Sequence, residues 1–157
     1  MFFFKKALFI IVLVLPLYIF SAEGAEAQAQ EILNISFLTA SKKYDFQMET
    51  ARTAAEKKQG LMFRTRLLPK RGMIFIYEKP EKVGIWMKNT IIPLDILFIT
   101  CNDRIEKIVY NRQPRNIIPV FSDSKICYVV EIAGGIAKKI KLNVGNKVVI
   151  EESGVSQ

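Results

Sequence analysis

Short apolar segments separated by turn residues constrain the fold of this chain more than any other feature of its sequence. Each segment holds four to eight residues that alternate between apolar and polar or are apolar throughout, a pattern typical of β-strands. The first two are joined by a turn at Ala40–Lys43 and predict a hairpin. We expect strands at Ile32–Thr39, Tyr44–Thr50, Met73–Tyr77, Val83–Met87, Leu94–Ile99, Arg104–Tyr110, Lys125–Ile132 and Lys147–Ile150.

Helix signals are few in comparison. Thr53 and Glu56 have the spacing of a capping box, so we expect a helix over Ala54–Phe63. Gly60 falls inside this helix at a cost of about 1 kcal/mol relative to alanine, which the close approach of a strand would explain. Gly134–Gly135 opens a second short helical turn. The predicted fold class is α+β, a mostly antiparallel, curled β-sheet or partly closed barrel of about eight strands with one to two short helices.

The N-terminus has the order of features of a secretory signal. Lysines at positions 5 and 6 precede an unbroken apolar run, Ala7–Phe20, and small residues follow it. Ala25–Ala27 supplies the A-x-A cleavage pattern, so we place cleavage after Ala27, with Ala29 as the second choice. The alternative is an uncleaved anchor helix, but the apolar run is shorter than the roughly 20 residues that cross a bilayer.

The domain organisation follows from this signal. We expect a signal peptide at residues 1–27, a single β-rich domain at residues 28–152 and a loose tail at residues 153–157. The export machinery is then a partner of the chain, and the periplasm is its expected location. We expect the exported domain to be a monomer.

The charge of the chain limits the partners that suit it. The formal net charge is +8, and the signal contains two lysines and two glutamates, so cleavage leaves this value unchanged. In an exported protein such an excess favours lipid headgroups, envelope polysaccharides or acidic substrates, and we expect no nucleic-acid partner. The alternative is that the charge only keeps the domain soluble.

Cysteine and histidine usage restrict the chemistry further. Cys101 and Cys127 each lie at the end of a predicted strand and can form a disulfide if those strands are neighbours. Otherwise they are two small buried residues. The sequence contains no histidine, which excludes Ser-His and Cys-His nucleophilic systems and the commonest zinc ligand set. We expect no cofactor.

Several segments together resemble a family of uncharacterised proteins, domain-of-unknown-function family 192. The resemblance extends from about Phe37 to Ile150 and is most specific at Trp86–Thr90 followed by Pro93–Asp95. Val130, where the family usually has leucine, and the two cysteines depart from the family pattern. The resemblance implies a compact β-rich domain, often exported, and leaves the activity open. The matching residues are Gly60–Met62, Arg64, Gly72–Phe75, Trp86–Thr90, Pro93–Ile96, Phe98, Tyr128–Glu131, Ala133–Gly134 and Val144–Gly145.

Asp95 is the polar residue that most strongly indicates a special role, because it lies inside an apolar strand. An unpaired buried carboxylate is very costly, so Asp95 must find hydrogen-bond donors. Arg64, Lys88 and the amide groups of Lys88–Thr90 are the nearest candidates along the predicted topology. Asp95 then either ties down a turn between two strands or acts as a perturbed acid or ligand-binding carboxylate.

Glu131 has a similar setting in the strand at Lys125–Ile132. If it shares a cleft with Asp95, the two carboxyl groups can divide acid and base roles, as in glycoside cleavage. This gives the alternative of a hydrolase that acts on cell-envelope polysaccharide. A salt bridge from Glu131 to a basic residue is the other interpretation.

Trp86 and three methionines suggest further binding roles. A tryptophan can support a sugar face or a cation, or it can pack in a core. Met62, Met73 and Met87 could supply soft sulfur ligands to Cu(I), although methionine more commonly fills gaps in cores.

These residues favour a non-enzymatic role over an enzymatic one. Our leading hypothesis is a ligand-binding or accessory protein of the cell envelope, with a polar cleft for a small ligand that carries anionic or hydroxylated groups. A purely structural envelope protein is a third possibility. The expected cleft residues are Arg64, Trp86, Lys88, Asn89, Asp95 and Glu131.

Overall fold

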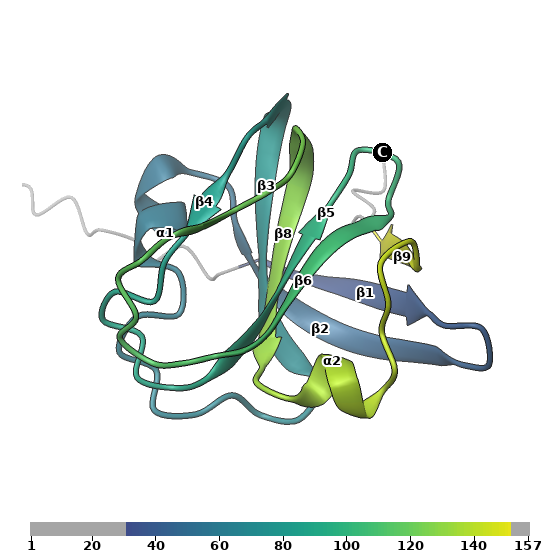
Figure 1. The fold of residues 1–157 in the computed structure, drawn as a ribbon, viewed down its shortest axis with the longest axis horizontal. Helices are drawn as coiled ribbons and strands as arrows, with labels where there is room; N and C mark the ends of the chain where they lie inside the picture. The colour runs from purple at the N-terminus through teal and green to yellow at the C-terminus, as the bar shows by residue number, and fades with distance from the viewer. Residues whose placement is uncertain (1–30, 152–157) are drawn as a thin grey trace, which may run out of the picture.

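The computed structural model describes residues 31–151, which form a strongly curled sheet of seven strands and a small ladder of two (Figure 1). The predicted signal and tail, residues 1–27 and 153–157, lie outside the described residues. The elements are β1 (Ile32–Leu38), β2 (Lys43–Ala51), α1 (Ala54–Gln59), β3 (Arg71–Glu81), β4 (Gly84–Ile85), β5 (Leu94–Ile99), β6 (Ile105–Arg112), β7 (Val120–Phe121), β8 (Ile126–Ala133), α2 (Ile136–Lys139) and β9 (Lys147–Glu151).

The large sheet has the strand order β6-β5-β8-β3-β2-β1-β9. All of its neighbouring pairs are antiparallel except β2 and β3, which are parallel and joined through α1. The two edges approach each other where Arg104 bridges Lys147 and the Ile105 N–H donates to the Asn146 carbonyl at 3.0 Å. The sheet is therefore a half-barrel that begins to close at its edges, which confirms the predicted fold class.

Two hydrophobic clusters lie on opposite faces of this sheet. The first contains side chains from all seven strands and from α2, as expected for the inside of a curled sheet. The second lies between the other face of β3, β5 and β8 and the segments that contain α1 and β4, which share one side of the sheet (Figure 1). The central strands are thus buried on both faces, which explains their continuous apolar sequences. Neither helix within residues 31–151 has the length and apolar character needed to cross a bilayer.

The first helix is shorter than its sequence predicted. The capping box of Thr53 and Glu56 is present, but α1 ends at Gln59 because Gly60 adopts a φ of 47°, in the left-handed region. A Cβ at Gly60 would lie 3.2 Å from Cζ of Phe75 on β3. The close approach of a strand is confirmed, and it coincides with the end of the helix and not with its middle.

Two other local predictions were wrong. The strand expected at Met73–Tyr77 is longer than predicted: β3 extends to Glu81, which still pairs with Ile126. The strand expected at Val83–Met87 is reduced to β4, which pairs with β7, a short strand that lies between two of the expected strands. The sequence that follows β4 turns back, with the Thr90 N–H donating to the Met87 carbonyl at 3.1 Å.

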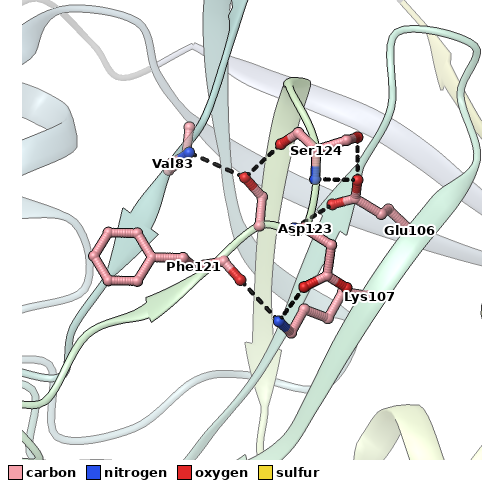
Figure 2. A network of polar contacts seen from close by, with 7 residues as sticks. Val83, Glu106, Lys107, Phe121, Asp123 and Ser124 are labelled. Atoms are coloured by element: carbon pink, nitrogen blue, oxygen red, sulfur yellow. Dashed lines mark hydrogen bonds and ion pairs between the residues drawn. The ribbon is translucent and has the colours of Figure 1, made fainter.

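A network of polar contacts fastens the β7 segment to its neighbours (Figure 2). The Ser122 hydroxyl accepts from the Val83 N–H at 3.1 Å and donates to the Ser124 carbonyl at 2.7 Å. Glu106 on β6 accepts from the Ser124 N–H at 2.8 Å, and the adjacent Lys107 donates to the carbonyl that precedes Ser122 at 2.9 Å. These contacts fix β7, and through it β4, against the sheet.

The predicted disulfide is formed. Cys101 and Cys127 are bonded, with their Cα atoms 4.9 Å apart, and join the turn after β5 to the start of β8. This bridge covalently links two of the strands that are buried on both faces.

Candidate functional site

Asp95 is fully buried, and main-chain donors surround its carboxyl group. It accepts hydrogen bonds from the N–H groups of Asn111 at 2.6 Å, Gly135 at 3.0 Å and Ala137 at 2.7 Å. These donors come from the end of β6 and the start of α2, and not from Arg64 or the Lys88–Thr90 segment as the sequence suggested. Asp95 therefore ties three segments together, which is the structural alternative of the two considered above.

The residues around Asp95 form one close-packed junction. The Gly134 N–H donates to the Pro93 carbonyl at 2.9 Å. A Cβ on Gly134 would lie 2.6 Å from Oδ1 of Asn111 and 3.0 Å from Cβ of Pro93, so only glycine fits there without a shift. The segments at Pro93–Asp95 and Ala133–Gly134, which carried part of the family resemblance, thus meet in a structural joint.

Asp95 and Glu131 do not share a cleft. Asp95 is the Cα partner of Ile132 across the β5–β8 pair, whereas Glu131 is the partner of Ile96. Directly opposed residues project to the same face and adjacent residues to opposite faces, so the sheet separates the two carboxyl groups. The predicted carboxylate pair for a polysaccharide hydrolase is therefore wrong.

Glu131 instead lines a pocket of about 330 Å³ on the second-cluster face of the sheet. Its side chain is flanked by its cross-strand partners Met73 and Ile96 and is only 4% exposed. None of the hydrogen bonds and ion pairs found within residues 31–151 uses its carboxyl oxygens, so the expected salt bridge is absent from this part of the chain. The pocket is lined by Lys57–Met62, Phe75, Tyr77, Gly84–Trp86, Thr90 and Glu131.

Burial controls the charge of Glu131. Desolvation by burial raises the pKa of its carboxyl group from 4.5 to about 8, because burial penalises the ionised form. At neutral pH the group is therefore mainly the neutral acid, which has one O–H donor as well as acceptor oxygens. A neutral carboxyl at the wall of a pocket can form hydrogen bonds that an ionised one cannot.

Aromatic rings and lysines form the other walls of this pocket. Trp86 is 46% exposed, and Nζ of Lys88 lies 5.3 Å from the centroid of its ring. Nζ of Lys57 lies 4.2 Å from the ring centroid of Tyr77. Burial, with smaller contributions from Glu81 and Glu131, raises the pKa of the Tyr77 phenol above its ordinary value, so the phenol stays neutral. The pocket thus combines a ring face, neutral hydroxyl and carboxyl groups and a cationic rim.

The Trp86–Thr90 loop separates this pocket from a second depression. The loop is fixed on one side by the Phe63 N–H, which donates to the Asn89 carbonyl at 2.9 Å. On the other side the Arg115 N–H donates to the Thr90 carbonyl at 2.9 Å, and the Met87 N–H donates to the Asn116 carbonyl at 2.8 Å. Trp86 and Thr90 line the Glu131 pocket, whereas Lys88 and Asn89 line the depression of about 410 Å³ beyond it.

The six residues expected in one cleft therefore lie in different places. Only Trp86 and Glu131 line the first pocket, while Lys88 and Asn89 line the second depression. Arg64 lines neither; it forms an ion pair with Glu49 on β2. Asp95 faces the opposite side of the sheet.

The three methionines considered for copper are also divided. Met73 and Met87 are buried in the second core cluster, and of the three only Met62 lines the pocket. Its sulfur lies 3.8 Å from Nδ2 of Asn89. Within the described residues, no group of three or more cysteine, aspartate or glutamate side chains is placed to hold a metal ion.

Sequence reasoning missed three residues of the Glu131 pocket. Tyr77 ends an apolar segment and carried no local signal for a site. Thr90 was noted for the family resemblance and for its main-chain amide, but not as part of a cleft. Lys57 lies within the helix expected over Ala54–Phe63 and carried no site signal of its own, but its ammonium group lies over the Tyr77 ring. Helical spacing from the capping box places Lys57 on α1, but only the fold brings α1 over β3.

The comparisons with known proteins identify the family and leave the activity open. The model of the DUF192 family, whose description reads "Uncharacterized ACR", matches residues 36–150. The chain therefore belongs to this family, as the motifs indicated. No protein with a curated description matches the chain in sequence.

Two crystal structures resemble this fold closely. A protein of unknown function from Novosphingobium aromaticivorans DSM 12444 is 36% identical, with a TM-score of 0.76 over 79% of this chain and 89% of that chain. A protein from Sinorhizobium meliloti 1021, described as a "putative transcription regulator", is 31% identical, with a TM-score of 0.76 over 78% of this chain and 95% of that chain.

The junction at Asp95 predicts a large stability effect from a nearly isosteric change. Asp95→Asn replaces one carboxylate oxygen by an NH₂ group that faces a main-chain N–H, and should lower the free energy of unfolding by about 3 kcal/mol. Chemical denaturation measures this change. Glu78→Gln, at an exposed position on β3, is the control and should change it by less than about 0.5 kcal/mol. Equal effects of the two substitutions would contradict the structural role of Asp95.

The buried Glu131 predicts a pH dependence of stability. The unfolded chain releases this proton near pH 4.5 and the folded chain near pH 8, so unfolding releases a proton between these values. This carboxyl group should therefore make the protein progressively less stable from pH 4.5 to pH 8, with no further change on either side. The upper limit of the loss is about 5 kcal/mol.

Glu131→Gln isolates this effect because glutamine does not titrate. The variant should match the wild type in unfolding free energy at pH 4 and exceed it increasingly up to about pH 8. Glu78→Gln, at an exposed position on β3, is the matched control. A constant difference between Glu131→Gln and the wild type from pH 5 to pH 8 would rule out the raised pKa.

Proposed function

We propose that this DUF192-family protein is an exported binding protein that holds a small hydroxylated ligand in the Glu131 pocket. The observation that carries the proposal is a buried carboxyl group that lines a pocket and has no hydrogen-bond partner within residues 31–151. Within residues 31–151, the fully buried side-chain polar atom left without a partner is Nε of Arg112, so the carboxyl oxygens of Glu131 retain access to the pocket. A ligand in the pocket can therefore form the hydrogen bonds that the protein itself does not supply to Glu131.

The pocket chemistry favours hydroxyl groups over charged groups as the partner of Glu131. A neutral carboxyl donates one hydrogen bond and accepts others, which matches a hydroxyl group that does both. Thr90 lines the same pocket, and a threonine hydroxyl has the same dual capacity. A cationic ligand is disfavoured because Lys57 and Lys58 line the pocket as well.

Trp86 favours a ring-shaped ligand. Its half-exposed indole presents a flat apolar surface at the pocket, suited to the C–H face of a sugar or cyclic polyol. The lysines at the rim can contact an anionic substituent, such as a phosphate, that extends toward solvent. The ligand class that best fits is therefore a neutral or singly phosphorylated sugar.

The N-terminal signal pattern and the disulfide support an exported, periplasmic protein. A disulfide persists in an oxidising compartment and not in a reducing cytosol. Envelope sugars would be available to a protein in that compartment. Because Asp95 and Glu131 project to opposite faces of the sheet, they cannot act as a glycosidase pair, and we propose ligand binding for the Glu131 pocket.

The proposal is tested by calorimetric titration of the chain from Gln28 onward with neutral hexoses, hexose phosphates and polyols. Trp86→Ala should weaken binding of the best ligand about tenfold through the loss of ring contact. Tyr110→Ala, which removes a similarly exposed aromatic ring outside the pocket, should leave affinity unchanged. Equal affinities of the two variants, or no binding by any of these ligands, would refute the proposal.

The pH dependence of binding identifies the part played by Glu131. If the neutral acid is the binding form, the wild-type affinity should fall about tenfold between pH 7 and pH 9, because the carboxyl group ionises near pH 8. Glu131→Gln keeps a donor and an acceptor and should bind equally well at both pH values. A wild-type affinity that rises with pH would instead mean that the carboxylate binds the ligand.

A further inference from the structure

We propose that the depression beside the Trp86–Thr90 loop docks on an anionic lipid bilayer, with Phe63, Ile91 and Ile117 entering its interface. Three separate loops contribute these side chains, and they line one depression of about 410 Å³. Phe63 is 69% exposed and Ile117 is 67% exposed, while Ile91 is partly covered. This docking surface is distinct from the Glu131 pocket and does not depend on the proposed ligand.

The docking surface is unusually apolar for the outside of a small domain. Single exposed apolar residues are common, but large apolar side chains that gather on one surface mark interaction sites. Ile118, next in sequence to Ile117, adds a fourth large apolar side chain that is 69% exposed. Burial of these side chains against another apolar phase would be favourable.

The loops hold this surface in a fixed arrangement. Phe63, Asn89 and Arg115 adopt φ angles of 63°, 56° and 57°, in the left-handed region that residues other than glycine rarely occupy. The main-chain hydrogen bonds from Phe63 to Asn89 and from Arg115 to Thr90 hold the loops in these conformations. Backbone strain of this kind persists only where the surroundings enforce it, and it commonly occurs at functional sites.

The charges on this surface favour an anionic bilayer as its binding partner. Lys88 and Arg115 line the depression together with the apolar side chains, and no acidic residue lines it. The whole chain carries a net charge of +8. Apolar side chains among lysine and arginine are the pattern of proteins that bind at a membrane surface, where the cations meet lipid phosphates.

Flotation with lipid vesicles tests the proposal. The chain from Gln28 onward is suitable because it contains both core clusters and lacks the apolar run Ala7–Phe20, which would itself bind lipid. We expect binding to vesicles of equal parts phosphatidylglycerol and phosphatidylcholine, little binding to phosphatidylcholine alone, and release at high salt.

Matched variants locate the contact. Phe63→Ser and Ile117→Ser should each weaken binding to the anionic vesicles about tenfold, because each removes a large apolar side chain from the interface. Val144→Ser is the control, since Val144 is 64% exposed but does not line the depression. The double variant Lys88→Gln with Arg115→Gln keeps the apolar side chains and should abolish the preference for anionic lipid. Circular dichroism verifies that each variant is folded.

Several outcomes would overturn the proposal. Vesicle binding that is equal in Phe63→Ser and Val144→Ser would place the contact elsewhere. Equal binding to anionic and neutral vesicles would contradict the proposed contact of Lys88 and Arg115 with anionic lipid. Self-association that is abolished by Phe63→Ser, without vesicle binding by the wild type, would make a second copy of the chain the occupant of this surface.

Discussion

The antiparallel pairing of β5 with β8 is the constraint on which the rest of the structure depends. Both strands are buried on two faces, so every side chain on them must fit one of two cores. The register sends Asp95 to one face and Glu131 to the other. Asp95 receives three main-chain donors and becomes a joint between segments, whereas Glu131 receives none within residues 31–151 and remains available at a pocket.

Local sequence pattern was sufficient for the fold class but not for the site. Alternation and turn residues predicted the hairpin of β1 and β2, and the Thr53 capping box predicted the start of α1. The donors to Asp95 could not be predicted, because Gly135 and Ala137 lie about 40 residues along the chain. Which carboxyl group faces which core depends on the register between distant strands, and local periodicity does not encode that register.

The Trp86–Thr90 loop connects the two proposed activities. Trp86 and Thr90 line the Glu131 pocket, whereas Lys88 and Asn89 line the docking surface. Both neighbouring loops donate main-chain hydrogen bonds to it, so it forms a rigid ridge between the two surfaces. A domain held at a bilayer through this ridge would present the Glu131 pocket close to the headgroups, where envelope sugars and lipid-linked sugars occur.

The most direct test of the central claim is a titration of the Glu131 side chain itself. Carbon-13 NMR of selectively labelled glutamate follows each carboxyl group, and Glu131→Gln identifies the resonance. Our account predicts a midpoint near pH 8 for Glu131, because a buried carboxyl group without a cationic partner holds its proton. A midpoint near the ordinary value of 4.5 would show that the group is ionised and solvated or paired, and would contradict the account.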